Sequence, residues 1–256
     1  MRVVKVIACL DIREGLVVKG VGFENLRNVR DPVEAAEAYC RQGVDGLVFL
    51  DILATLENRR TRLEWVRKVA EKATVPFTVG GGIGSVEEAA ELIKLGVDKV
   101  SVNTAAVENP ELIRKATKEF GRERIVVAID GRKNPTGNGL PRLEVVTRSG
   151  SKSTGMDIVA WAKKVEGLGA GEILLTSKDA DGTQTGYDLE MTRAVAEAVG
   201  IPVTASGGAG TLEHLYEAVT TGKASAVLVA SGFHFGGMTA MDAKKYLKDR
   251  GIPVYT

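Results

Sequence analysis

Cysteine and histidine are scarce in this sequence, which limits the metal and redox chemistry that it can support. The 256 residues include two cysteines, Cys9 and Cys40, and two histidines, His214 and His234. Their spacing matches no zinc site, and two isolated cysteines cannot make a disulfide framework. We therefore expect no metal and no cofactor, and we expect two free thiols in a reducing cytoplasm.

An excess of charge and long apolar runs are also missing. The 34 basic residues nearly balance the 33 acidic ones, so the composition does not indicate a nucleic-acid partner. No apolar run approaches the roughly 18 residues of a membrane helix, and the N-terminal segment reaches Asp11 too early for a signal peptide. These absences predict a cytoplasmic protein that binds neither nucleic acid nor membrane.

What the sequence contains is a regular alternation of short apolar runs and helical patterns. Runs rich in valine and isoleucine that do not alternate with polar residues predict strands buried on both faces. They lie at residues 3–10, 47–50, 76–79, 99–102, 125–129, 172–175, 202–205 and 226–230. Helix caps are predicted at Asp31, Ser85, Asn109, Thr211 and Thr239. Eight such units predict an α/β fold, a (β/α)8 barrel that spans residues 1–256 as one domain, with a doubly wound open sheet as the alternative.

The two halves of the chain resemble each other. PFTVGGGI, from Pro76, is echoed by PVTASGGA 126 residues later, and LVFL, from Leu47, is echoed by ILLT at the same offset. VIACLD, which ends at Asp11, is echoed by IVVAID, which ends at Asp130. A repeat of this length predicts a barrel of two duplicated halves rather than a solenoid.

Glycine clusters follow the third and seventh predicted strands, at the end of the barrel where active sites lie. Glycine lets an anion approach backbone N–H groups, and the following helix turns its positive end towards it. We therefore predict two phosphate sites, one at Gly82, Asn103 and Thr104 and the other at Gly207, Gly208, Ala230 and Ser231. Symmetry places them on opposite sides of the mouth, which predicts a long ligand with a phosphate at each end. Tight-turn glycines without a ligand are the alternative.

Two aspartates occupy equivalent strand ends between these sites. Asp11 and Asp130 are expected to face each other across the mouth, as general acid–base chemistry requires. The alternative is that each caps the following turn. Thr176, at the end of the sixth strand, and Asp181 are candidates for substrate binding, although Asp181 and Asp51 fit a loop-organising role equally well.

These residues resemble those of a known family. CLDIREGLVVKG, VGGGIGSVEEA, DKVSVNTAAVENP, GAGEILLTS and DGTQTGYD together resemble the cyclase subunit of imidazole glycerol phosphate synthase, the HisF family, over about residues 3–253. The resemblance implies a (β/α)8 barrel that uses ammonia in histidine biosynthesis. Its substrate would be the bisphosphate phosphoribulosyl formimino aminoimidazole carboxamide ribonucleotide (PRFAR). The products would be imidazole glycerol phosphate and aminoimidazole carboxamide ribonucleotide (AICAR).

The resemblance also implies roles for individual residues. Asp11 and Asp130 would be the acid–base pair, and Lys19, in a mobile first loop, would close over the substrate. A HisH-type glutaminase would dock at the N-terminal face of the barrel as a heterodimer and supply ammonia through the barrel interior. Positions of a charged gate on this path match Lys5, Lys99 and Glu172.

Several residues depart from the family pattern. Lys5 replaces a usual arginine and Gly46 a usual glutamate, and each change removes an interaction that the gate would use. Further departures are Gly22, Gly131, Ser225 and the loop SKDADGT.

Two alternative functions stay open. The isomerase of the same pathway, which acts on the aminal precursor ProFAR, shares the barrel, both aspartates and both phosphate sites, although VVKG and ILLTSKDADGT favour the cyclase. A divergent or engineered barrel with altered or no activity is also compatible with the departures. In addition, residues 133–154 carry a turn motif and an alternating strand pattern, which predict a hairpin over the mouth.

Overall fold

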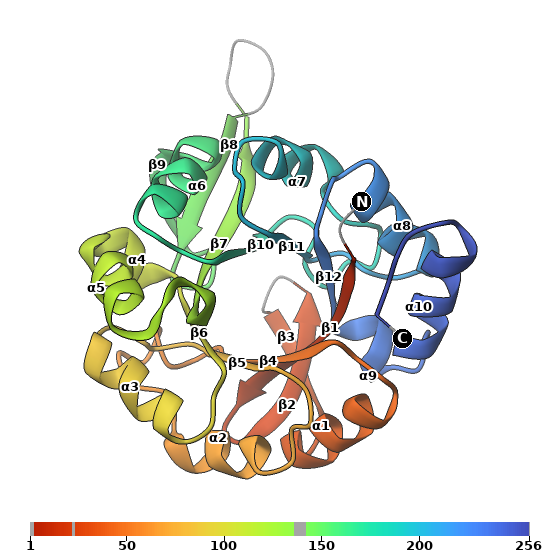
Figure 1. Cartoon of the computed structure of the whole chain (residues 1–256), viewed down its shortest axis with the longest axis horizontal. Coiled ribbons are helices and arrows are strands. Elements are labelled where there is room, and N and C mark those ends of the chain that lie inside the picture. Colours follow the sequence, from red (N-terminus) through yellow and green to blue (C-terminus); the bar gives the residue numbers. More distant parts are fainter. Residues whose placement is uncertain (1–2, 22–23, 136–141, 256) are drawn as a thin grey trace.

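The computed structural model describes residues 3–21, 24–135 and 142–255, and within these ranges eight parallel strands close into a barrel (Figure 1). The strands are β1 (Lys5–Arg13), β4 (Gly46–Asp51), β5 (Phe77–Gly80), β6 (Lys99–Val102), β7 (Ile125–Asn134), β10 (Glu172–Ser177), β11 (Val203–Ser206) and β12 (Ala226–Val229). They follow one another around the ring in this order, and β12 pairs with β1 to close it. All eight predicted strands are confirmed, and the open-sheet alternative is wrong.

An outer ring of helices surrounds the strands (Figure 1). The helices are α1 (Pro32–Arg41), α2 (Leu63–Ala70), α3 (Val86–Lys94), α4 (Thr104–Glu108), α5 (Glu111–Phe120), α6 (Ile158–Gly167), α7 (Leu189–Ala196), α8 (Leu212–Thr220), α9 (Ser231–His234) and α10 (Ala240–Asp249), with a short 3₁₀ turn at Arg122–Arg124. In the part of the chain that the structure describes, none of them has the length and apolar character needed to cross a membrane.

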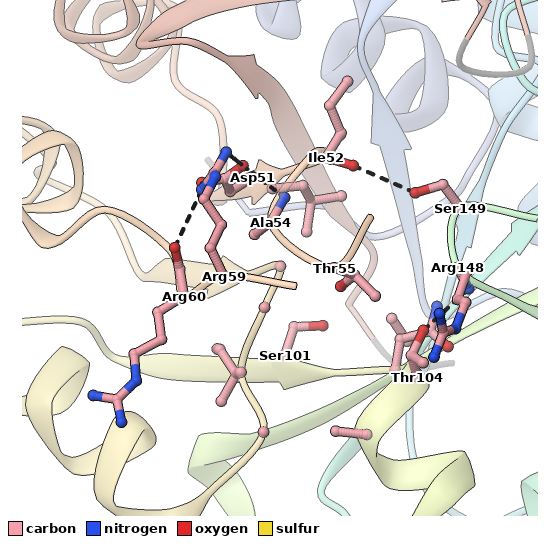
Figure 2. Close-up of a pocket in the computed structure, with 18 of the residues that line it drawn as sticks. Asp51, Ile52, Ala54, Thr55, Arg59, Arg60, Ser101, Thr104, Arg148 and Ser149 are labelled. Atoms are coloured by element: carbon pink, nitrogen blue, oxygen red, sulfur yellow. Dashed lines mark hydrogen bonds and ion pairs between the residues drawn. The ribbon is translucent and has the colours of Figure 1, made fainter. Parts of the chain in front are cut away.

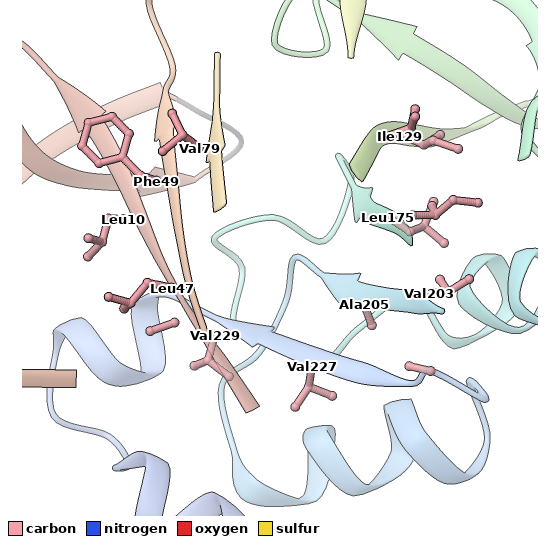
Figure 3. Packing of buried hydrophobic residues seen from close by; sticks show 14 of the residues in the cluster. Leu10, Leu47, Phe49, Val79, Ile129, Leu175, Val203, Ala205, Val227 and Val229 are labelled. Carbon is pink, nitrogen blue, oxygen red and sulfur yellow. The ribbon is translucent and has the colours of Figure 1, made fainter. Parts of the chain in front are cut away.

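The strands carry apolar residues on both faces because each face is buried differently. Leu10, Phe49 and Val79 belong to the cluster that packs under the helices (Figure 3). Ile7 and Val48 belong to a separate cluster inside the barrel. A fully buried side chain of this size contributes about 1.5–3 kcal/mol to folding, so both layers stabilise the barrel.

Four of the five predicted helix caps are confirmed. Asp31 Oδ1 accepts hydrogen bonds from two backbone N–H groups of α1, and Ser85 Oγ accepts from the N–H of Glu88. Thr211 and Thr239 also cap their helices, and each forms a capping box. The prediction for Asn109 is wrong. A short helix, α4, begins at the end of β6 and takes Asn109 as its C-terminal cap, while Pro110 precedes α5 without a side-chain cap.

Two antiparallel hairpins are inserted at equivalent points of the two halves. The strands β2 (Leu16–Val21) and β3 (Glu24–Arg30) follow β1, where the sequence predicted only a mobile loop. The strands β8 (Arg142–Thr147) and β9 (Lys152–Asp157) follow β7, as predicted for residues 133–154. The turn at residues 136–141 and the departure at Gly22 lie outside the described residues.

The duplicated halves share their backbone details. Asp31 caps α1 and Asp157 caps α6, 126 positions apart, which is the offset of the sequence repeat. Asn58 and Gln184, at the same offset, both have a positive φ, of 50° and 59°. These agreements support the predicted duplication, because an uncommon backbone conformation recurs at matching positions.

The glycine clusters of the two halves are packed against the loop before them. A Cβ atom at Gly208 would lie 1.9 Å from the carbonyl oxygen of Gly186, and one at Gly82 would lie 2.5 Å from that of Arg59. Both glycines also have a positive φ. Only glycine fits these two positions without moving backbone.

We expect Gly208→Ala to destabilise the fold more than Gly43→Ala. Gly43 also has a positive φ, but a Cβ atom there would meet nothing within 4 Å. Alanine at this position therefore lowers the free energy of unfolding only by the cost of a left-handed backbone conformation, about 1–2 kcal/mol. Alanine at 208 adds a clash with backbone. Urea unfolding of the two variants measures the difference. Equal losses of stability would contradict the close packing around Gly208.

Candidate functional site

The carboxyl ends of the barrel strands bring a buried ion network together. Lys19 Nζ lies 2.8 Å from Asp11 Oδ2 and 3.1 Å from Asp181 Oδ1. All three side chains are less than 10% exposed. Burial opposes the charged form of Lys19, but the two carboxylates outweigh it and raise its pKa. The ammonium therefore stays charged at neutral pH and fixes β2 over the mouth.

Asp130 stands in a different environment from Asp11. Its Oδ2 accepts a hydrogen bond of 2.9 Å from Asn103 Nδ2. Burial raises the pKa of Asp130 to about 6, and the hydrogen bond from Asn103 and the charge of Lys178 partly offset this. A carboxyl group of this kind changes its protonation state near neutral pH, whereas Asp11 is held in an ion pair. The mouth thus contains two carboxyl groups of different character.

Several buried polar atoms at the mouth have no hydrogen-bond partner among the described residues. They are Ser101 Oγ, Asn103 Oδ1 and Asp181 Oδ2. Native proteins leave few such atoms unpaired, and those that remain call for a ligand or water. Burial also raises the pKa of Asp181, against the effect of Lys19. These atoms mark where a polar ligand would be bound.

The larger of two cavities at the mouth has a volume of about 450 Å³ and contains the first predicted phosphate site (Figure 2). Gly82, Asn103, Thr104, Asp130 and Thr176 all line it. These five predicted residues are therefore brought together around one space.

A neighbouring cavity of about 40 Å³ contains the second predicted phosphate site. Its walls include Asp11, Lys19, Asp181, Gly207, Gly208, Ala230 and Ser231. Leu50 and Thr176 line both cavities, so the two spaces adjoin across the mouth. This arrangement suits an elongated ligand with one end in each half.

Asp51 lines the larger cavity and organises the loop that follows β4. Its side chain is fully buried, and both oxygens are engaged by Arg59, at 2.6 and 3.0 Å. Oδ1 also accepts from the N–H of Ala54. This pair holds the β4–α2 loop, whose backbone packs against Gly82.

The predicted gate residues lie together at the opposite, N-terminal end of the barrel. Lys99 Nζ is 2.6 Å from Glu172 Oε2, and Thr204 donates to Glu172 Oε1 at 2.8 Å. Lys5 and Gly46 line the same cavity of about 30 Å³. A space of this size holds one or two molecules as small as water.

Sequence reasoning missed other residues of the mouth. Arg148 lines the larger cavity, yet its only signal was a place beside Ser-Gly in a predicted hairpin. The Nδ1 atom of His214 caps α8 by accepting hydrogen bonds from the backbone N–H groups of Gly210 and Thr211. His234 is buried, and Tyr39 Oη lies 2.5 Å from its Nδ1.

The contact with Tyr39 gives His234 a structural role inside the fold. Burial lowers its pKa to about 4, so the ring is neutral at physiological pH. The neighbouring Phe235 is 58% exposed.

The fold and the polar mouth define the chain as a (β/α)8 barrel protein with two glycine-lined cradles around a pair of carboxyl groups. The family model of the histidine biosynthesis proteins matches residues 5–239. The chain therefore belongs to this family of biosynthetic enzymes. The family contains both the HisF cyclase and the HisA isomerase, and the match does not separate them.

We expect Asp130→Asn to remove a pH dependence of stability. Because the pKa of Asp130 is raised from 3.8 to about 6 on folding, its contribution is fully present below about pH 4 and is lost as the pH rises to 6. A shift of this size corresponds to about 3 kcal/mol. The variant should therefore be more stable than the parent above pH 6, and the difference should vanish near pH 4.

Urea unfolding between pH 4 and 8 measures this effect. Asp249→Asn, at an exposed position of α10, serves as the control and should run parallel to the parent. Parallel curves for Asp130→Asn would show that its carboxyl group is not perturbed.

Proposed function

We propose that the chain is an ammonia-dependent cyclase that converts PRFAR into imidazole glycerol phosphate and AICAR. Both enzymes of the family would use two carboxyl groups and two phosphate cradles, so the mouth alone does not favour either one. The observation that carries the proposal is the polar cluster at the other end of the barrel axis.

That cluster has no use for a reaction confined to the mouth. Lys99 and Glu172 form a partly buried ion pair beside a small cavity, and even partial burial of such a pair costs desolvation that apolar residues would avoid. Above it, the barrel interior is lined by the apolar side chains of Ile7, Cys9, Val48, Val126, Leu174, Ala226, Leu228 and Ala230. A polar entrance followed by an apolar interior fits delivery of a small neutral molecule such as ammonia to the mouth.

At the mouth, the reaction needs protons moved in both directions. Addition of ammonia to the substrate carbonyl removes a proton from nitrogen and protonates the oxygen, which leaves as water. The new nitrogen then bonds to the formimino carbon and closes the ring. The bond from that carbon to the AICAR nitrogen breaks, and the leaving amine takes up a proton. Asp130, with a pKa of about 6, is suited to exchange protons with the substrate. Asp11 faces the second cradle and is oriented by Lys19. We assign the two residues as the acid–base pair, with Asn103 orienting Asp130.

We further propose that a glutaminase subunit docks at the N-terminal face and supplies the ammonia. Gly46 lies at this face without a side chain, and a Cβ there would meet only ordinary contacts, the nearest at 3.4 Å from the carbonyl oxygen of Pro76. The packing therefore does not require glycine. The charged residues that line this entrance include Lys5, the Lys99–Glu172 pair and Asp45, which pairs with Lys244.

Incubation of the protein with PRFAR and an ammonium salt at alkaline pH tests the activity. We expect AICAR to form, and we expect Asp11→Asn and Asp130→Asn each to lower turnover by at least about 100-fold because an acid–base group is lost. Circular dichroism checks that both variants fold, and Asp249→Asn is the control. Absence of AICAR with the parent protein contradicts the cyclase, and conversion of ProFAR to its ketose product would instead identify the isomerase. If neither product forms, the chain is a barrel without either activity.

Lys99→Met tests the path through the barrel. With a glutaminase subunit of the pathway and glutamine, ammonia must pass the entrance, whereas an ammonium salt also supplies ammonia to the mouth from solvent. We therefore expect the glutamine-dependent rate to fall more than the ammonium-dependent rate. An equal fall in the two rates would place the effect in the mouth and contradict passage by Lys99.

A further inference from the structure

The turn between β8 and β9 holds an uncommon conformation above the larger cavity. Arg148, Ser149 and Gly150 have positive φ values of 53°, 55° and 82°. Tight hairpin turns commonly have positive φ at their central residues, but these positions favour glycine and asparagine, so arginine and serine are uncommon there. The contacts that the turn makes across the mouth show which groups it positions.

Those contacts tie a hairpin of the second half to the first half. The N–H of Arg148 donates to Thr104 Oγ1 at 3.1 Å, and Ser149 Oγ donates to the carbonyl oxygen of Ile52 at 3.4 Å. On the other side, the side chain of Lys178 runs so close to Gly150 that a Cβ there would lie 2.6 Å from its Cε. Figure 2 shows Arg148 beside Thr104 and Ser149 pointing to Ile52.

The contact with Thr104 has a chemical consequence for the first phosphate site. A hydroxyl group both donates and accepts, and here a lone pair of Thr104 Oγ1 accepts from the backbone of Arg148. This leaves the hydroxyl hydrogen to donate into the cavity that Gly82 and Asn103 also line. Thr104 is thereby oriented as a donor to an anion.

The guanidinium group of Arg148 is held more weakly than the other arginines of this cavity. Arg59 is fixed by two short bonds to the buried Asp51, and Arg60 lies 2.7 Å from Glu88. Arg148 pairs only at 3.5 Å with Glu108, and both side chains are about half exposed. A long, solvent-screened pair contributes little, whereas a guanidinium group binds phosphate through two charge-assisted hydrogen bonds.

We propose that Arg148, which belongs to the second half of the barrel, is a phosphate-binding residue of the first phosphate site. Its guanidinium group leaves Glu108 and binds the phosphate held by Gly82, Asn103 and Thr104, while its backbone keeps the Thr104 hydroxyl pointed at the same phosphate. The assignment rests on the proposed function, because that function places a phosphate end of the substrate here. The turn is then the means of bringing a cation across the mouth.

Titration with inorganic phosphate, followed by the backbone amide resonances of the protein, tests this assignment without turnover. Gly82 and Thr104 report the first site, and Gly208 reports the second. We expect Arg148→Met to raise the phosphate midpoint at Gly82 and Thr104 by at least about fivefold, since a charge-assisted pair is lost, and to leave the midpoint at Gly208 unchanged. Arg148→Lys should give an intermediate value. Arg114→Met is the control, because Arg114 is similarly exposed and also pairs with a glutamate, but it lies on α5 outside the cavity lining.

An unchanged midpoint at Gly82 in Arg148→Met would overturn the assignment, as would an equal rise at both sites. An absence of phosphate shifts at Gly82 and Thr104 in the parent protein would also overturn it. The cyclase assay separates the two proposals. AICAR formation with no Arg148 effect refutes only this inference, and an Arg148 effect without AICAR formation refutes only the proposed function.

Discussion

The buried ammonium group of Lys19 requires carboxylate partners, and this requirement determines how the mouth of the barrel is built. An unpaired charge at 7% exposure would cost several kcal/mol of desolvation. The partners are Asp11, at the end of β1, and Asp181, in the loop after β10. Because these two aspartates belong to different halves of the chain, the ion pairs of Lys19 join the first hairpin to both halves.

The second hairpin makes the same kind of crossing in the opposite direction. Lys19 reaches from the first half to Asp181, and Ser149 reaches from the second half to the backbone at Ile52. A duplicated barrel whose halves met only through strand pairing would leave the mouth open between them. The hairpins instead place side chains of each half over the cradle of the other, so that a ligand spanning the mouth meets groups from both.

The sequence predicted the features that depend on local pattern and failed on those that depend on distant contacts. Strand runs, glycine cradles and most caps follow from neighbouring residues, and they were found. The prediction for Asn109 is wrong because Asn-Pro indicates a helix boundary but does not show whether the asparagine ends one helix or begins the next. The pairs Lys19–Asp181 and Ser149–Ile52 join residues 162 and 97 positions apart. Their geometry depends on the folded-back hairpins, which no local spacing specifies.

An apolar layer lies between the two charged ends of the barrel. Lys99 and Glu172 neutralise each other at the N-terminal end, and Lys19 lies between two carboxylates at the mouth. The apolar layer between them contains no charged side chain in the interior cluster of the described residues. In such a medium an uncompensated charge would act over a long distance, so a bare cation at the entrance would shift the protonation of Asp130. Glu172 prevents this for Lys99, and the raised pKa of Asp130 follows from its burial and from groups at the mouth, namely Asn103, Asp181 and Lys178.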